Sequence, residues 1–328
     1  MKLKTIATLR IALASLAASL PLLHAPSLMA QDYPRGQVKV IVPFTPGGGT
    51  DIMARLISQK LQELWSRPVI VDYRPGAGTV LGIDAVAKSP PDGLTIGIVV
   101  SSYTINPGLL KSMPYDTLKD LTGVTLLTRF ALAFFADPKL SFDTIKGLVD
   151  FAKRNPGKLS FASPGIGGTP HLAGELLNIV AGIDLLHIPY TGSAPAAQDV
   201  VGGRVPLLGD PLFTDMPFVK AGRLKVIAVT SEKRVPGYEQ YPTIAETYPG
   251  FDVVGYTGFV VPAATPLAIV RNIQAMSAKA LALPELRARI VEMGNEPIGS
   301  TPEAFDAFIA GDIKKWAKVI ADAKIPKE

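Results

Sequence analysis

The sequence of 328 residues contains no cysteine. This absence excludes disulfide bonds, a metal site built from thiolates, a cysteine nucleophile and a lipid anchor on an N-terminal cysteine. It is also compatible with an exported bacterial protein, since such a chain folds without any oxidation step. The length is enough for two domains with substantial hydrophobic cores.

The sequence also lacks clusters of lysine and arginine interleaved with aromatic residues. Residues 1–30 carry three positive charges and no acidic residue, so removing them lowers the formal net charge from +5 to +2. A nearly balanced charge without a basic patch argues against nucleic acid as a partner.

No apolar run after the N-terminus is long enough to span a bilayer. At the N-terminus, Lys2, Lys4 and Arg10 precede the short apolar run 11–23, and small residues follow up to Ala30. This pattern predicts a secretory signal peptide over residues 1–30, with Ala25 as a second cleavage position. We therefore expect the mature chain in the periplasm.

Two phosphate-binding motifs are absent as well. No Lys-Ser or Lys-Thr pair follows the glycine-rich stretches, which excludes a P-loop. The nearest approach to a dinucleotide fingerprint is the stretch 76–82, whose last glycine comes one residue late and which has no identifiable ribose-binding acid. We therefore expect no cofactor.

Two glycine-rich stretches, residues 46–50 and 164–169, share the order Gly-Gly-Thr, so that Thr50 aligns with Thr169. Each follows a strand-like run and precedes a helix-like run, which predicts two turns from strand to helix, here called elbows. Pro170 after Thr169 indicates a threonine N-cap with proline at the first helical position. Glycines leave the helix N-terminus open, where free N–H groups and the helix dipole favour an anion. The alternative is that both stretches are only tight connections.

Strand-like and helix-like segments alternate along the mature chain, which predicts α/β domains with doubly wound sheets. The extended runs 124–135 and 253–261 bracket a second α/β unit, as expected if the chain crosses to a second domain and returns. We predict one domain from residues 31–130 and 256–328 and another from residues 131–255. Two crossover strands would form a hinge, and a ligand would bind between the two lobes at the carboxyl ends of the strands.

Motifs spread in order along the mature chain resemble the periplasmic solute-binding proteins of tripartite tricarboxylate transport systems, also called the Bordetella uptake gene product family. They are the following: Tyr33-Pro34, Ile41-Val42-Pro43-Phe44, Arg74-Pro75-Gly76-Ala77-Gly78, Pro90-Pro91-Asp92-Gly93-Leu94-Thr95, Ser163-Pro164-Gly165, Gly167-Gly168-Thr169-Pro170-His171-Leu172, Ile188-Pro189-Tyr190, Lys220-Ala221-Gly222-Arg223-Leu224 and Pro262-Ala263. The segment 255–258 departs from the family, which often has a larger aromatic residue there.

The resemblance implies a two-lobed Venus flytrap fold and a monomer without enzymatic activity. Such a protein captures a small carboxylate for a transporter with one large and one small membrane subunit. In the family, backbone N–H groups, hydroxyls and water hold the carboxylate, without an arginine salt bridge. Carried over by position, this implicates Phe44, Gly48, Gly49, Thr50, Asp51, Ser163, Gly167, Gly168, Thr169 and His171.

Further candidates lie in loops at the predicted strand ends. They are Ala77, Gly78, Ser102, Tyr103, Tyr190, Thr191 and Asp210. Some candidates have structural alternatives: Asp51 could simply complement a helix dipole, His171 could be a buried structural residue, and Phe44 could belong to the core.

Two other functions remain open at this point. A periplasmic sensory subunit for a membrane kinase would bind the same ligands. A secreted hydrolase would use Ser163 and His171, but no Gly-x-Ser-x-Gly motif is present, and Pro164 lacks the N–H that an oxyanion hole needs. The sequence does not identify the acid: tricarboxylates, C4 to C6 dicarboxylates, acidic amino acids and aromatic acids all fit.

Overall fold

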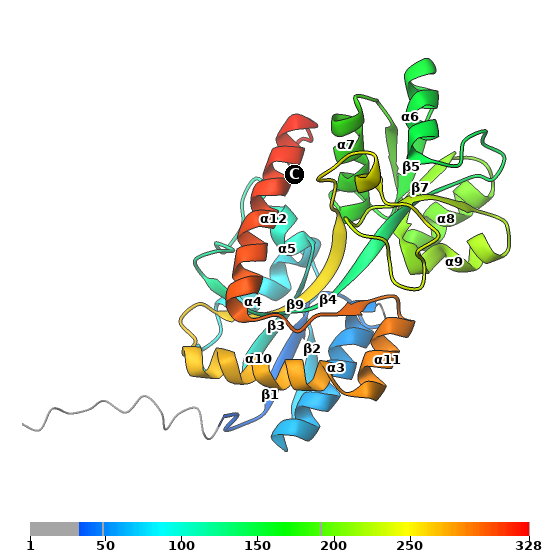
Figure 1. The fold of residues 1–328 in the computed structure, drawn as a ribbon. Helices are drawn as coiled ribbons and strands as arrows, with labels where there is room; N and C mark the ends of the chain where they lie inside the picture. Colours follow the sequence, from blue (N-terminus) through cyan, green and yellow to red (C-terminus); the bar gives the residue numbers. More distant parts are fainter. Residues whose placement is uncertain (1–32, 48, 191, 328) are drawn as a thin grey trace, which may run out of the picture. The chain divides into compact units, whose positions relative to one another are not determined.

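Strands and helices alternate along the chain in nearly the predicted order (Figure 1). The structure, a computed structural model, describes residues 33–327 except Gly48 and Thr191. The predicted signal peptide, residues 1–30, therefore lies outside the described residues. The chain divides into residues 1–33 and residues 34–328, and the following description concerns the second part.

The first lobe is built on a mostly parallel sheet. β1 lies between β2 and β3 and is parallel to both, and β9 pairs antiparallel with β3. Its elements are β1 (Val38–Val42), α3 (Gly49–Trp65), β2 (Val69–Tyr73), η1 (Ala77–Thr79), α4 (Val80–Ala87), β3 (Thr95–Val100), α5 (Ser102–Leu109), β9 (Val254–Pro262), α10 (Leu267–Leu281), α11 (Pro284–Glu292), β10 (Glu296–Pro297) and α12 (Pro302–Asp322).

The second lobe repeats the α/β pattern. β5 lies between β6 and β7 and is parallel to both. Its elements are α6 (Ile145–Arg154), β5 (Ser160–Ser163), α7 (Thr169–Ala181), β6 (Leu186–Pro189), α8 (Ser193–Val201), β7 (Leu207–Pro211), α9 (Leu212–Lys220), β8 (Lys225–Val229) and η2 (Ile244–Glu246).

The long strand β4 (Leu121–Ala136) belongs to both sheets, and with β9 it forms the two crossovers predicted from the sequence. β4 runs from the first lobe into the second. β3 has the same direction, because both strands are antiparallel to β9, so the carboxyl ends of β1, β2 and β3 point toward the second lobe. β7 is antiparallel to β4, so the carboxyl ends of β5, β6 and β7 point back toward the first lobe. The two edges predicted to bind ligand therefore face each other.

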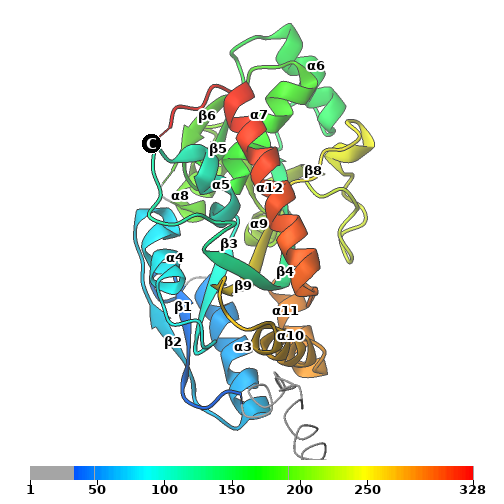
Figure 2. The ribbon, with the colours of Figure 1, turned by 90° about the vertical axis from the view of Figure 1, so that its left-hand side faces the viewer.

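Helix α12 runs alongside elements of both lobes (Figure 2). It packs against α5 and β4 in the first lobe and against α7 in the second. Asp312 of α12 accepts hydrogen bonds from the buried Thr104 hydroxyl of α5 (2.7 Å) and from the Trp316 indole (2.9 Å). Thr104 also lies 3.1 Å from the Tyr256 hydroxyl on β9. This buried network connects α12 and α5 to one of the two crossovers.

Four helices were not predicted from the sequence, namely α5, α8, α9 and α11. Each contains a proline, which in a sequence indicates a break. In α8 and α11 the proline lies in the first turn, where its missing N–H has no partner to lose. None of the helices within the described residues has the length and apolar character that crossing a bilayer requires.

Candidate functional site

The first elbow follows β1 and is organised by Asp51. This buried side chain accepts hydrogen bonds from the Gly47 N–H (2.8 Å), the Tyr73 hydroxyl (2.7 Å) and the Arg55 Nε–H (2.8 Å). Burial alone would raise the pKa of Asp51, but these hydrogen bonds outweigh it and lower that pKa. Both carboxylate oxygens are engaged in fixing the loop, which favours the structural alternative for Asp51.

The position of Thr50 differs from the prediction. α3 begins at Gly49, so Thr50 is the second helical residue and not the N-cap. Glycine at the helix start leaves the N–H groups of the first turn uncovered by a side chain. Gly49 is exposed, and a Cβ built on it would meet no atom within 4 Å. Gly48, another candidate of this elbow, lies outside the described residues. Phe44 is partly buried, which is compatible both with lining the crevice and with belonging to the core.

The loop after β2 adds a left-handed run to the same edge. Gly76, Ala77, Gly78 and Thr79 all have positive φ angles of 136°, 45°, 58° and 83°. Positive φ at alanine and threonine is strained and survives only where the surroundings enforce it, which is common at binding sites. Here Asn106 donates to the Gly78 carbonyl (2.9 Å), and Thr79 lies 2.9 Å from the Ser102 hydroxyl. The candidates Ala77 and Gly78 are exposed at the rim, and Ser102 is held at the start of α5.

The second elbow follows β5, and here too the cap lies one residue earlier than predicted. Gly168 is the N-cap of α7, with φ −72° and ψ 160°, and no side chain caps the helix. Thr169 is therefore the first helical residue and Pro170 the second. Proline has no N–H, so Gly168, Thr169 and His171 provide the free donors of this turn. Gly167 has φ +70°, and a Cβ on it would come within 2.2 Å of Leu109 in α5, so only glycine fits.

His171 supports the second elbow from inside. Its side chain is buried, and its Nδ1 accepts a hydrogen bond from the Gly167 N–H (3.0 Å). Its ring stacks on that of His187 from β6. The buried Ser163 hydroxyl, another site candidate, contacts His187 Nε2 (2.7 Å) and the Gly165 carbonyl (3.0 Å). This geometry favours the structural alternative for His171, and it pairs Ser163 with His187 rather than with His171.

Two tyrosine candidates have internal hydrogen-bond partners. Tyr103 is buried in the first lobe, where its hydroxyl donates to the Thr117 carbonyl (3.0 Å). This burial corrects the expectation that Tyr103 belongs to the cleft rim. Tyr190 is half-buried, and its hydroxyl donates to Asp199 (2.7 Å). The residue also packs against the hydrophobic core of the second lobe. The neighbouring candidate Thr191 lies outside the described residues.

Asp210 lies at the end of β7 but has no exposed surface. One of its oxygens accepts a hydrogen bond from the Ser193 hydroxyl (2.9 Å), and the other has no donor among the residues that the structure describes. Burial and then repulsion by Asp215 raise the pKa of Asp210, and burial raises that of Asp215. Asp210 thus belongs to a buried carboxyl pair behind the rim and does not reach the cleft surface.

The cations next to the first elbow are already paired. Arg55 forms an ion pair with Asp51 (2.8 Å) and Arg74 with Asp72 (3.1 Å). In the described part of the chain no three histidine, aspartate or glutamate side chains come together as metal ligands. The groups of the elbows that could contact an anion are therefore chiefly main-chain N–H groups and hydroxyls.

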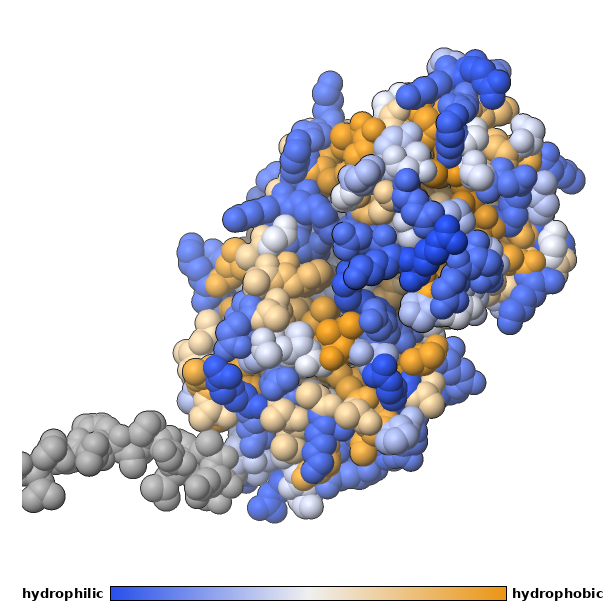
Figure 3. Space-filling view, in the orientation of Figure 1, coloured by the Kyte–Doolittle hydropathy of each residue, from blue (hydrophilic) through white to orange (hydrophobic). Residues whose placement is uncertain are grey.

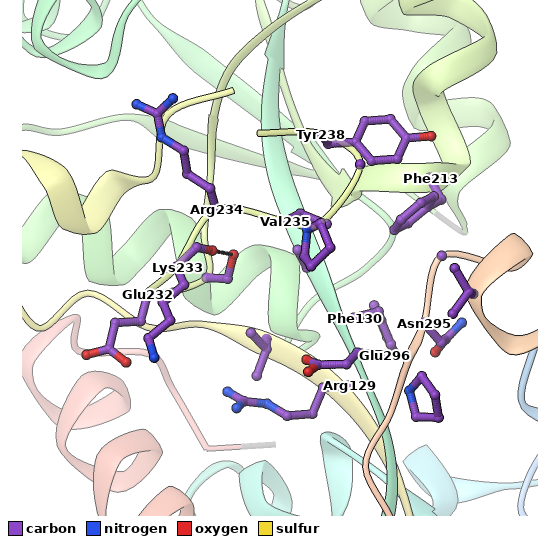
Figure 4. Close-up of a pocket in the computed structure, with 18 of the residues that line it drawn as sticks. Arg129, Phe130, Phe213, Glu232, Lys233, Arg234, Val235, Tyr238, Asn295 and Glu296 are labelled. Carbon is purple, nitrogen blue, oxygen red and sulfur yellow. Dashed lines mark hydrogen bonds between the residues drawn. The ribbon is translucent and has the colours of Figure 1, made fainter. Parts of the chain in front are cut away.

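A cavity of about 710 Å³ is lined by residues of β4, β10, α11 and the loop after β8. Figure 3 shows hydrophilic side chains around this region. Figure 4 shows Arg129 and Phe130 of β4 in the cavity wall, with Phe213 of α9 and Tyr238 across from them. Acidic and basic side chains both line the cavity, and Arg129 pairs with Asp252 (3.3 Å). Its mixed charge distinguishes this cavity from the glycine-rich elbows.

Several residues that shape the site were not found from the sequence. Thr79 and Asn106 fix the left-handed run, His187 supports the second elbow, and Asp215 and Ser193 contact Asp210. Their roles depend on contacts between segments far apart in the chain. Only the position of Thr79, directly after a Gly-Ala-Gly turn, carried a local signal.

Comparison with known proteins agrees with this geometry. The family model described as "Tripartite tricarboxylate transporter family receptor" matches residues 53–325. The protein BugT of Bordetella pertussis is 34% identical over 301 residues, which cover 91% of this chain and 92% of BugT. A UPF0065 protein of a Pseudomonas species, from the tcbD-tcbE intergenic region, is 36% identical over 89% of this chain and 88% of its own length.

Solved structures give the same result. The R. palustris protein Rpa4515 with adipate is 32% identical, with a TM-score of 0.77 over 90% of this chain and all of that one. MatC from Rhodopseudomonas palustris with bound malate is 28% identical, with a TM-score of 0.73 over 88% of this chain and all of that one. The periplasmic binding protein BugD is 32% identical, with a TM-score of 0.74 over 90% of this chain and all of BugD.

Proposed function

The chain belongs to the tripartite tricarboxylate transporter receptor family, and from this premise we propose that it captures a small organic carboxylate in the periplasm for a membrane transporter. The transporter would have the large and small membrane subunits of this type of system. The acid would enter between the lobes, and closure about the two crossovers would bury it.

The observation that carries this proposal is the pair of glycine-rich helix starts on facing strand edges. α3 begins at Gly49, and α7 follows the N-cap Gly168, which forms no side-chain cap with the described residues. Charge-assisted hydrogen bonds to N–H groups contribute roughly 1.5–3 kcal/mol each. Three or four of them support micromolar affinity after the cost of ordering the bound state. The relatives with bound adipate and malate support a carboxylate as the ligand class.

We further propose that the protein binds its ligand without transforming it. A hydrolase would need an accessible serine, whereas Ser163 has no exposed surface and its hydroxyl is engaged by Gly165 and His187. Pro164, directly after this serine, also lacks the N–H that an oxyanion hole would use.

The test is a thermal-shift screen of the purified mature protein against di- and tricarboxylates, acidic amino acids and aromatic acids. An acid that binds only the folded state raises the melting temperature by mass action. We expect a subset of dicarboxylates to give a saturable increase, and calorimetry then gives the affinity. If no carboxylate changes the melting temperature while a neutral or cationic solute does, the proposal is wrong.

A further inference from the structure

Two imidazole rings lie directly behind the second elbow. His171 of α7 and His187 of β6 stack with ring centroids 3.8 Å apart and planes at 16°. The His187 ring also packs against that of Phe161, with ring centroids 4.9 Å apart. His171 is buried and His187 is half-buried.

The His171 ring fixes the peptide that precedes the helix cap. Its Nδ1 accepts the Gly167 N–H at 3.0 Å, so that nitrogen carries no proton, and the neutral ring has its hydrogen on Nε2. Nε2 lies 3.6 Å from a carboxylate oxygen of Glu175, one turn further along α7. The hydrogen bond thus selects one orientation of the ring and one conformation of the elbow.

The His187 ring fixes the other end of the same loop. Its Nε2 lies 2.7 Å from the Ser163 hydroxyl, which also contacts the Gly165 carbonyl at 3.0 Å. Burial, and secondly the neighbouring His171, lower the pKa of His187 to about 3. His187 is therefore neutral at physiological pH, so its ring does not repel the stacked His171 ring electrostatically.

We propose that His171 and His187 are positioning residues of the anion site. They hold loop 163–168 in the conformation that aims the free N–H groups of α7 into the cleft. This inference rests on the proposed function of the elbow. Its energetic basis is pre-organisation, because a loop that must be ordered on binding subtracts that cost from the affinity.

The two rings use different nitrogen atoms, which gives a specific test. An asparagine side chain places its polar atoms near the position of histidine Nδ1, and glutamine places them near Nε2. His171→Asn should keep an acceptor for Gly167, whereas His171→Gln should lose it. At position 187 the order reverses, because His187→Gln keeps the contact with Ser163 and His187→Asn loses it.

Affinity for malate and adipate, measured by calorimetry on the four folded variants, is the first readout. We expect His171→Asn and His187→Gln to bind within about threefold of the wild type, and the other two to bind roughly 10–100-fold more weakly, as when the partner that orients a ligating group is removed. If the two rings contributed only by packing, the same substitution, asparagine or glutamine, would give the higher affinity at both positions. That outcome, or equal affinities in all four variants, would overturn the proposal.

Hydrogen exchange of loop 163–168 in the ligand-free protein is the second readout and needs no ligand. The Gly167 amide should exchange faster in His171→Gln than in His171→Asn, and unchanged exchange in both variants would refute the positioning role. If the wild type binds neither acid but the exchange pattern appears, the proposed ligand class fails while the positioning of the elbow is supported.

Discussion

Raising the pH should destabilise the protein through two aspartates of the second lobe. Asp210 at the end of β7 and Asp215 in the first turn of α9 have no exposed surface. The Ser193 hydroxyl donates to one oxygen of Asp210, and no described residue donates a hydrogen bond to the other three carboxyl oxygens. Within the described part of the chain, no lysine, arginine or histidine contributes to the pKa of either group. The pair therefore needs at least one proton of its own to remain buried.

Stability decreases with rising pH because the pKa values of both aspartates are raised in the folded protein. Their neutral forms contribute stability that is complete below the ordinary aspartate pKa of 3.8. That contribution is lost as the pH rises through the raised values. While the folded chain holds one proton more than the unfolded chain, the free energy of unfolding falls by about 1.4 kcal/mol per pH unit. Between about pH 6 and pH 8 the loss should reach about 2–3 kcal/mol, or several degrees in the melting temperature.

Urea unfolding at a series of pH values measures this loss directly. In Asp210→Asn or Asp215→Asn the amide can donate to the remaining carboxylate and does not titrate. We expect each variant to have a smaller decrease in stability with pH than the wild type. Asp184→Asn, a change at an exposed aspartate, is the matched control and should leave the slope unchanged. A wild type with constant stability over this pH range, or an unchanged slope in both variants of the pair, would refute the reasoning.

Other changes give shorter tests. Gly168→Val should keep the fold, since a Cβ there meets nothing closer than 3.7 Å, but should weaken carboxylate binding at least tenfold in calorimetry by covering the N–H groups; wild-type affinity would contradict a binding role for this elbow. Asp51→Ala should lower the free energy of unfolding by about 1–3 kcal/mol in urea titrations, because the Tyr73 hydroxyl loses its acceptor. The lowered pKa of Asp51 means that its contribution to stability is present above the ordinary carboxyl pKa and is lost in acid. The difference in stability between the wild type and Asp51→Ala should therefore shrink as the pH falls through the lowered pKa. A difference that persists in acid would contradict a stabilising role for the charged carboxylate. Thr104→Val should cost about 1–3 kcal/mol by leaving the buried Asp312 short of a donor, and thermal unfolding equal to wild type would show that this hydrogen bond is dispensable.

The order of strands and helices and the two-lobed fold were predictable because they depend on local periodicity and on glycine and proline in the turns. The extended runs predicted at 124–135 and 253–261 are β4 and β9, whose bounds differ from the prediction by at most three residues. The helix caps were less predictable. Threonine and glycine have similar N-cap propensities, so residue preference does not decide between them, and in the structure Gly168 is the cap and Thr169 follows it.

Contacts between distant segments were not predictable from the sequence. Nothing local to Tyr103 shows that its hydroxyl donates to Thr117 inside the first lobe. Likewise, the stacking of His187 on His171 requires β6 and α7 to be neighbours, which only the folded sheet establishes. The motif order predicts which edge of the sheet holds the site, and packing decides which polar residues remain exposed there.

The most direct measurement is a crystal structure of the mature protein with a bound dicarboxylate from the thermal-shift screen. We expect one carboxylate group to lie about 3 Å from main-chain nitrogen atoms at the starts of α3 and α7, with the lobes closed around it. A carboxylate held by an arginine side chain, with both glycine-rich loops unoccupied, would contradict binding by the helix starts.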